Sequence, residues 1–303
     1  TANGTHGGGS AYSTGVTYQL DGSTVTASAF ISGFSSASSR KLIITVAASA
    51  PTLYYYCYYH SGMGGAINTN STLGSSNFDG TIQTTVKANT TAGFSIVLWT
   101  GNGSSGATIG HGLGVTPNFA FAKSRTSVTN WATVDFDLQT GGQLNTSQVF
   151  SNGNYNAYYA AQPSSTVLTL GSNGATNGNT NNYVAYVFSE VAGYSKFGKY
   201  TGNGSTDGTF VFTGFRPALI ILKRTNSVAS WVIHDDKRAG YNGDNDYLHP
   251  DLLQAESDGS TGTLDILSNG FKLKMTAGTH NGSGDTYIYL AFAQSPFKNA
   301  RAR

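Results

Sequence analysis

Short runs of apolar and β-branched residues, broken by Gly/Asn turns, recur along the whole chain and predict many short strands. Polar segments separate these runs, and the 3.6-residue periodicity of an amphipathic helix is almost absent. Such a pattern is typical of antiparallel β-sandwiches. A brief helix is expected only at 251–255. The clearest predicted strands are 42–46, 53–59, 118–123, 131–136, 166–170, 183–188, 218–223, 231–235, 262–267 and 287–292.

Two stretches of the chain carry nearly the same sequence. Trp99-Thr100-Gly101-Asn102-Gly103 is matched by Tyr200-Thr201-Gly202-Asn203-Gly204, and Trp131 is matched by Trp231. A period of this length is the size of a whole domain. We therefore expect an all-β chain with two tandem antiparallel β-sandwich domains. The expected boundaries are an N-terminal β segment at 1–70, a linker at 71–91, repeat one at 92–191 and repeat two at 192–303.

Composition supports strands and narrows the function classes. Charged residues make up 11% of the 303 residues and the net charge is +2, so no basic stripe indicates nucleic-acid binding. There are 39 glycines, which disfavours helix. No run reaches the length of a membrane span. The chain begins at Thr1 rather than Met, and we expect it to be the product of a longer chain.

The single cysteine lies in the most specific chemical motif of the chain. Cys57 is followed by His60 and then by Met63, directly after a predicted strand. A thiolate, an imidazole and a thioether are the ligands of blue-copper sites. This part resembles the C-terminal end of a cupredoxin domain, whose second histidine would here have to be His6. The alternative is a cupredoxin-derived fold in which the loop is kept for packing.

Acidic residues follow both tryptophan-bearing strands. Asp135 and Asp137 stand in the first repeat, and Asp235 and Asp236 stand in the second. Paired carboxylates are the groups that glycosidases use. No second carboxylate with a recognisable motif accompanies them, so solvated acids at strand ends are the preferred interpretation. A catalytic pair remains the alternative.

Two polar loops rich in aromatic residues are the predicted binding surfaces. One spans 151–163 and the other 239–250. Aromatic rings on mobile polar loops suit stacking on glycans or contact with protein, and they could equally be buried against a neighbouring subunit. The candidate binding residues are Tyr155, Tyr158, Tyr159, Tyr241, Tyr247 and His249.

Several segments of the sequence resemble segments of structural proteins of marine tailed bacteriophages. The segments at 5–10 and 53–65 resemble a cupredoxin-like segment of such proteins. The segments at 78–115 and 193–217 resemble the phage repeat module that often follows it, and 287–297 resembles their usual end. The resemblance covers nearly the whole chain and implies a virion component. It carries over no catalytic residue.

The resemblance and the repeat together predict a non-enzymatic virion structural protein. We expect a surface-exposed fibre, decoration or adhesion module on the virion surface, without a cofactor. Expected partners are other virion proteins, further copies of this chain in a homo-oligomer, and a host surface glycan or receptor. Two alternatives stay open: a virion-associated polysaccharide depolymerase and a copper-binding cupredoxin-type module.

Overall fold

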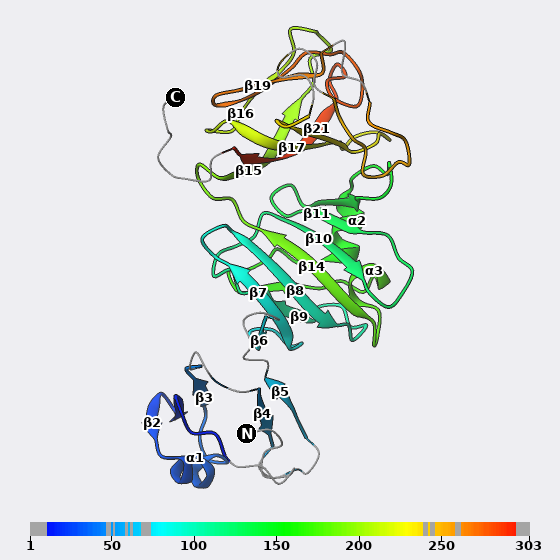
Figure 1. Cartoon of the computed structure of the whole chain (residues 1–303). Helices are drawn as coiled ribbons and strands as arrows, with labels where there is room; N and C mark the ends of the chain where they lie inside the picture. The colour runs from blue at the N-terminus through cyan, green and yellow to red at the C-terminus, as the bar shows by residue number, and fades with distance from the viewer. Residues whose placement is uncertain are drawn as a thin grey trace. The chain divides into compact units, whose positions relative to one another are not determined.

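A computed structural model describes residues 11–46, 50, 52–57, 60, 63–67, 74–238, 242, 246–257 and 262–294. The chain divides into two compact units, Thr1–Ser76 and Asn77–Arg303. The described elements are mostly strands in antiparallel sheets (Figure 1), so the all-β prediction is confirmed. No helix of the described residues is long and apolar enough to cross a membrane.

The N-terminal unit has little hydrophobic core. Strands β1 (Val16–Leu20), β2 (Ser23–Val25) and β3 (Arg40–Ile44) form a sheet in the order β2-β1-β3, and helix α1 (Ala27–Gly33) connects β2 to β3. Strands β4 (Leu53–Tyr56) and β5 (Gly64–Ile67) form a separate hairpin. Among the described residues of this unit, the buried hydrophobic side chains are Ala37 and Leu53. Whether this unit derives from a cupredoxin therefore stays a prediction.

The second unit begins with a sandwich whose main sheet has seven strands in the order β12-β11-β10-β14-β8-β7-β6. A two-stranded sheet, β13-β9, lies opposite, and helices α2 and α3 complete that layer (Figure 1). Strand β6 spans the boundary between the units. The bounds are β6 (Ser75–Asn77), β7 (Thr84–Asn89), β8 (Phe94–Thr100), β9 (Thr108–Gly110), β10 (Phe119–Ser124), β11 (Ala132–Asp135), β12 (Thr140–Gln143), α2 (Asn152–Tyr158), β13 (Val167–Thr169), α3 (Gly174–Asn177) and β14 (Asn182–Phe188).

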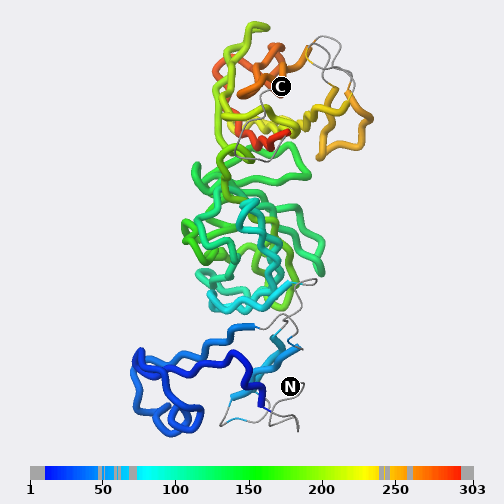
Figure 2. The backbone as a smooth tube through the Cα atoms, turned by 60° about the vertical axis from the view of Figure 1, so that its left-hand side comes forward, coloured from blue at the N-terminus to red at the C-terminus, as the bar shows by residue number. Residues whose placement is uncertain are grey.

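A second sandwich follows, and it repeats the arrangement of the first. Its main sheet has the order β15-β21-β17-β18, which matches β8-β14-β10-β11 strand for strand. A three-stranded sheet, β16-β20-β19, forms the other layer. Figure 2 shows the chain passing from the first sandwich into the second. The bounds are β15 (Ser195–Thr201), β16 (Phe210–Phe212), β17 (Pro217–Arg224), β18 (Val232–Asp235), β19 (Leu264–Leu267), β20 (Gly270–Leu273) and β21 (Thr286–Ala293).

The repeated Thr-Gly-Asn-Gly turn is fixed in both sandwiches by a buried asparagine. Asn177 Oδ1 accepts a hydrogen bond from the backbone N–H of Asn102 at 3.0 Å, and Asn281 Oδ1 accepts one from that of Asn203 at 2.9 Å. Both asparagines are fully buried. Since a buried amide must find partners, this shared network explains the repeated motif without a ligand.

The two sandwiches pack their main sheets against each other through a layer of aromatic and aliphatic side chains. Strand residues alternate between the two sides: Ala120 and Ala122 face the first core, while Phe119 and Phe121 face this layer. The fully buried Trp231 also lies in it. The buried members of the layer are Phe119, Phe121, Phe150, Phe197, Trp231, Ile288 and Leu290.

One pair of equivalent residues meets beside this layer. Phe188 pairs with Phe94 in the first main sheet, and Phe292 pairs with Ser195 at the same place in the second. The rings of Phe188 and Phe292 lie 6.0 Å apart. The rest of the joint is asymmetric: Trp231 is fully buried against the first half, whereas its counterpart Trp131 stacks on Tyr186 of its own half.

Three expectations about local structure are wrong. The region 71–91 is not only a linker, because β7 pairs with β8 along five residues and belongs to the main sheet. The expected helix at 251–255 is not formed. Helix α2 forms instead in the segment 151–163, which was expected to be a loop.

Candidate functional site

The three tyrosines expected on a mobile surface loop lie in the core of the first sandwich. Tyr155, Tyr158 and Tyr159 are 2%, 4% and 1% exposed. Their spacing places them on one side of α2, and the rings of Tyr155 and Tyr159 contact the edge or face of Phe136 at 6.2 and 5.3 Å. Ser151 caps the helix by accepting a hydrogen bond from the N–H of Asn154. The expectation of an exposed tyrosine surface here is wrong.

The other expected loop is only partly described. Tyr241 lies outside the described residues. Tyr247 is partly buried against the second core. The Nδ1 atom of His249 lies 2.6 Å from the backbone carbonyl oxygen of Trp231. The rings of Tyr247 and His249 meet edge to face at 5.3 Å. The two residues are thus brought together, but both are partly buried rather than exposed as a free aromatic surface.

Tyr247 packs on a histidine pair that the sequence analysis missed. His234 and His280 are fully buried, and their Nε2 atoms lie 2.9 Å apart. The Nδ1 atom of His280 lies 2.8 Å from the hydroxyl of Thr279. Since one Nε2 must donate and the other accept, at least one of the two rings must be neutral for this hydrogen bond to form. The pair forms the polar centre of the second sandwich.

Burial disfavours the charged form of both rings. It lowers the pKa of His280 to about 3, with His249 adding repulsion. It lowers the pKa of His234 well below its ordinary value. Repulsion from His280, Arg238 and His249 lowers this pKa further, and a backbone hydrogen bond with Asp246 acts in the opposite direction. The Nε2 atoms of the two rings contact each other, and the Nδ1 atom of His280 contacts the hydroxyl of Thr279. We therefore interpret the pair as a structural part of the core whose protonation makes the stability of the fold depend on pH.

The repeat alignment reveals where the pair comes from. His234 opposes Ile220 in the register of β17 and β18, as Val134 opposes Ala120 in β10 and β11. His280 directly precedes the buried Asn281, as Thr176 precedes the buried Asn177. The second sandwich thus has two histidines where the first has a valine and a threonine. Comparing the repeats position by position could have identified the pair from the sequence.

The cysteine motif brings two of its four expected ligands together. Cys57 Sγ lies 3.2 Å from His60 Nδ1, and the backbone N–H of Cys57 donates to the carbonyl oxygen of Met63 at 2.7 Å. Met63 is 59% exposed, and His6 lies outside the described residues. A thiolate and an imidazole fit one copper ion. No group of three His, Cys, Asp or Glu suited to a metal occurs among the described residues.

The aspartates after the tryptophan strands share a structural role. Asp135 Oδ1 accepts a hydrogen bond from the N–H of Leu138, and Asp235 Oδ1 accepts from those of Lys237 and Arg238. Burial raises the pKa of Asp135 to about 6. The pKa of Asp235 is lowered by its hydrogen bonds and by the ion pair with Arg238, which outweigh its partial burial. The carboxylate at this position holds the turn in both sandwiches.

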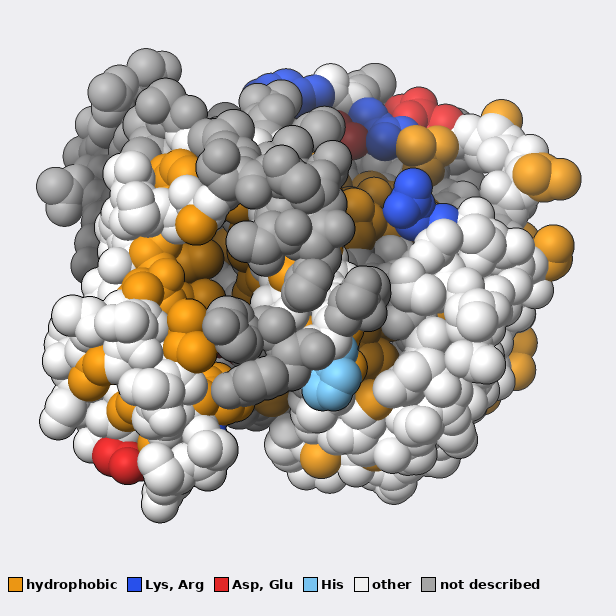
Figure 3. Space-filling view, turned by 90° about the horizontal axis from the view of Figure 1, so that it is seen from below, with side chains coloured by type: hydrophobic (Ala, Val, Ile, Leu, Met, Phe, Trp, Pro, Cys, Tyr) orange, Lys and Arg blue, Asp and Glu red, His pale blue; other side chains and the backbone are white. Residues whose placement is uncertain are grey.

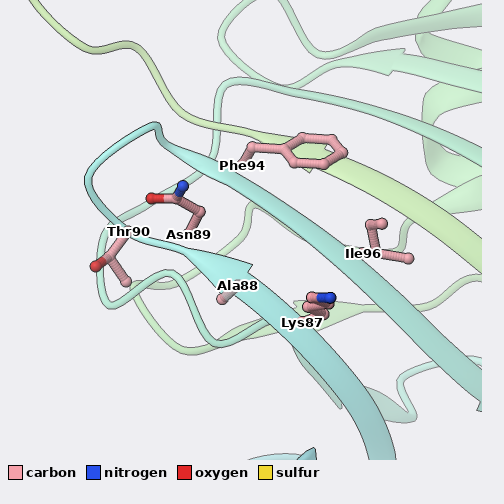
Figure 4. Close-up of a pocket in the computed structure, with 6 residues that line it drawn as sticks. All are labelled: Lys87, Ala88, Asn89, Thr90, Phe94 and Ile96. Atoms are coloured by element: carbon pink, nitrogen blue, oxygen red, sulfur yellow. The ribbon is translucent and has the colours of Figure 1, made fainter. Parts of the chain in front are cut away.

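An open depression of about 440 Å³ lies on the outer face of the first main sheet, between β7 and β8 (Figure 4). Phe94 and Ile96 provide its apolar side, and Lys87, Asn89 and Thr90 provide polar groups. The ring of Phe94 is nearly parallel to that of Tyr186, with centroids 6.3 Å apart. The depression combines an aromatic ring with polar groups, and sequence reasoning missed it because it assigned this segment to a linker.

Comparison with protein families gives one match, which covers residues 67–296 and so includes both sandwiches. The model is described as a domain of unknown function, DUF7483. The chain belongs to the DUF7483 family. No curated protein and no solved structure matches the chain. The DUF7483 region therefore contains the histidine pair, the aromatic layer and the Phe94 depression, while Cys57 and His60 precede it.

Proposed function

We propose that this chain is a non-enzymatic structural protein of a tailed-phage virion, exposed at the particle surface as a fibre, decoration or adhesion module. The observation that carries the proposal is the aromatic layer that joins the two sandwiches. A display module must hold its parts at fixed positions, and a buried hydrophobic interface removes the relative motion that is otherwise expected between domains.

Hydrogen bonds between the sandwiches add directional constraints to this layer. The indole N–H of Trp231 donates to the carbonyl oxygen of Gln143 at 2.8 Å, and the ammonium of the buried Lys223 donates to that of Ser147 at 3.3 Å. The N–H of Ala229 also donates to the carbonyl oxygen of Ser147. Contacts of both kinds support a rigid pair rather than two tethered domains.

The low surface charge fits an extracellular particle component. On the face in Figure 3, acidic and basic side chains are few among the described residues. The Phe94 depression is our candidate contact surface for a host glycan, because an aromatic ring beside an amide and an ammonium suits stacking and hydrogen bonding with a sugar. Phe94→Ala is expected to weaken binding of the full chain to host cells at least tenfold, whereas Val228→Ala on an exposed loop serves as the control.

Location on the particle gives the direct test of the proposal. Antibodies against the recombinant chain are expected to label intact purified particles in negative-stain electron microscopy. Pre-absorption of the antibodies with the chain supplies the control and should abolish the label. Label confined to soluble host-cell proteins, with bare particles, would refute a virion role.

Copper binding is a second candidate, favoured by the contact between Cys57 and His60. The chain loaded with Cu(II) is expected to show a strong thiolate-to-copper absorption that Cys57→Ser abolishes. A colourless, copper-free protein after loading would end this candidate. The depolymerase alternative is tested by Asp235→Asn, which should remove polysaccharide cleavage if Asp235 is catalytic.

A further inference from the structure

In the first sandwich, a segment of the chain lies along the outer edge of β9. The N–H of Ile82 donates to the carbonyl oxygen of Thr108 at 3.0 Å, and the hydroxyl of Thr84 donates to that of Gly110 at 2.9 Å. Ile82 also forms a parallel bridge with Ile109. Residues 80–84 thus extend the second layer of this sandwich by pairing with β9.

Strand β16 occupies the same position in the second sandwich. It follows the second Thr-Gly-Asn-Gly turn, as β9 follows the first. The N–H of Leu273 donates to the carbonyl oxygen of Thr209, and the N–H of Thr213 donates to that of Asn269. Since alternate residues of a strand point to opposite edges, Phe210 and Phe212 direct their backbone groups away from β20. Thr108 and Gly110 do the same on β9.

Nothing in the described part of the chain pairs with this outer edge of β16. The strand is the last in the order β16-β20-β19. Phe210 and Phe212 are 45% and 62% exposed. At the position equivalent to Phe212, the first sandwich has Gly110, where a Cβ would lie 1.7 Å from the Asn77 side chain. The first sandwich is built to be covered at this edge, whereas the second presents two aromatic rings there.

Connectivity explains the difference. The segment that covers β9 leads directly into β7 of the first sandwich. The element that precedes the second sandwich is β14, a central strand of the first sandwich, so it does not cover β16. A neighbouring edge, that of β15, is protected instead: Glu190 accepts a hydrogen bond from the N–H of Phe197 at 2.8 Å and pairs with Lys196. Charged groups of this kind are the usual protection of edge strands.

We propose that the open edge of β16 binds an extended strand from a different protein, by main-chain hydrogen bonds to Phe210 and Phe212. Pairing of this kind is a common mode of peptide recognition. The strand should carry an apolar side chain that faces the core beside Val211, as Ile82 does beside Ile109, and its alternate side chains should pack on the two rings. The copy of 80–84 in this chain is already engaged with β9, so a second copy has none to supply. The inference does not depend on a virion role.

The probe is a labelled peptide of residues 77–90, tested against the full chain by fluorescence anisotropy and hydrogen exchange. We expect saturable binding and slower exchange of the Phe210 and Phe212 amides. Phe212→Lys should weaken binding about tenfold or more, since lysine protects edge strands. Val228→Lys is the matched control, because Val228 is 64% exposed and lies away from this edge. Phe210→Lys repeats the test if Phe212→Lys is poorly folded by circular dichroism.

Four results would overturn the proposal. The first is no saturation up to about 1 mM peptide, which corresponds to about 4 kcal/mol of binding free energy. The second is slower exchange only at Thr108 and Gly110, which would indicate displacement of the chain's own segment. The third is self-association of the chain that Phe212→Lys abolishes, which would make a second copy the occupant. A scrambled peptide that binds equally well would also refute strand recognition.

Discussion

Replacing the buried histidine pair by the residues of the first sandwich tests how far the second sandwich responds to acid. In the variant His234→Val/His280→Thr, the core loses two groups whose pKa values burial lowers. A histidine with a lowered folded pKa binds fewer protons in the folded state than in the unfolded state at mildly acidic pH. Its contribution to stability is complete above 6.5 and is lost as the pH falls toward the folded pKa, about 3 for His280.

The magnitude follows from proton linkage. Each neutral buried histidine changes the free energy of unfolding by up to about 1.4 kcal/mol per pH unit below its unfolded pKa. Two histidines therefore remove about 2.5 kcal/mol between about pH 6 and pH 5. Asp135, whose folded pKa is about 6, acts in the opposite direction, because its folded form takes up a proton more readily than its unfolded form. Asp135 is present in both proteins, so its effect cancels in the comparison.

Urea denaturation at a series of pH values supplies the assay. The parent chain should lose stability on acidification faster than the variant, by about 2.5 kcal/mol per pH unit around pH 5.5. Val232→Ala, a core substitution on the same strand, controls for general destabilisation and should keep the parent slope. Equal slopes for the parent and the double variant would refute the assignment of two neutral rings.

Four further substitutions test the packing and the edge protection. Tyr287→Phe should lower the free energy of unfolding by about 1–3 kcal/mol, because the hydroxyl accepts from one backbone N–H and donates to a carbonyl. Tyr159→Phe should be neutral or stabilising in the same denaturation assay, because that buried hydroxyl has no partner among the described residues. Trp231→Ala should cost about 3–5 kcal/mol by the same measurement, and a loss below 1 kcal/mol would contradict a buried joint. Glu190→Ala should expose the edge at Phe197 and promote self-association in sedimentation velocity, and an unchanged monomer would argue against a protective role.

The duplication and the strand-rich fold could be predicted because they depend on local pattern. The repeated turn and the two tryptophans fix the equivalence of the halves, and turn residues separate the strands. Strand β7 could not be recognised with confidence in advance, because its sequence is polar and its conformation comes from pairing with β8. Strands whose conformation comes from pairing with a neighbour depend on context more than on propensity.

The tyrosine segment shows how tertiary packing outweighs composition. Its asparagines and glycine favour a loop, yet Tyr155 and Tyr159 are four positions apart and Ser151 stands at a helix N-cap position. Burial of these rings against Phe136 stabilises a short helix that would not form alone. The histidine pair was equally hidden, since its members are far apart in the sequence and meet only when β18 and the turn before β21 are in place.

Because the two halves are covalently joined, the contact between Phe188 and Phe292 does not depend on protein concentration. A dimer of separate modules would dissociate on dilution, whereas a tethered pair meets its partner at an effective concentration set by the short connection. The connection from Phe188 to Ser195 also fixes the ratio of the halves at one to one. Each half is then free to change alone, which is how one half can carry a histidine pair where the other has a valine and a threonine while their shared joint stays intact.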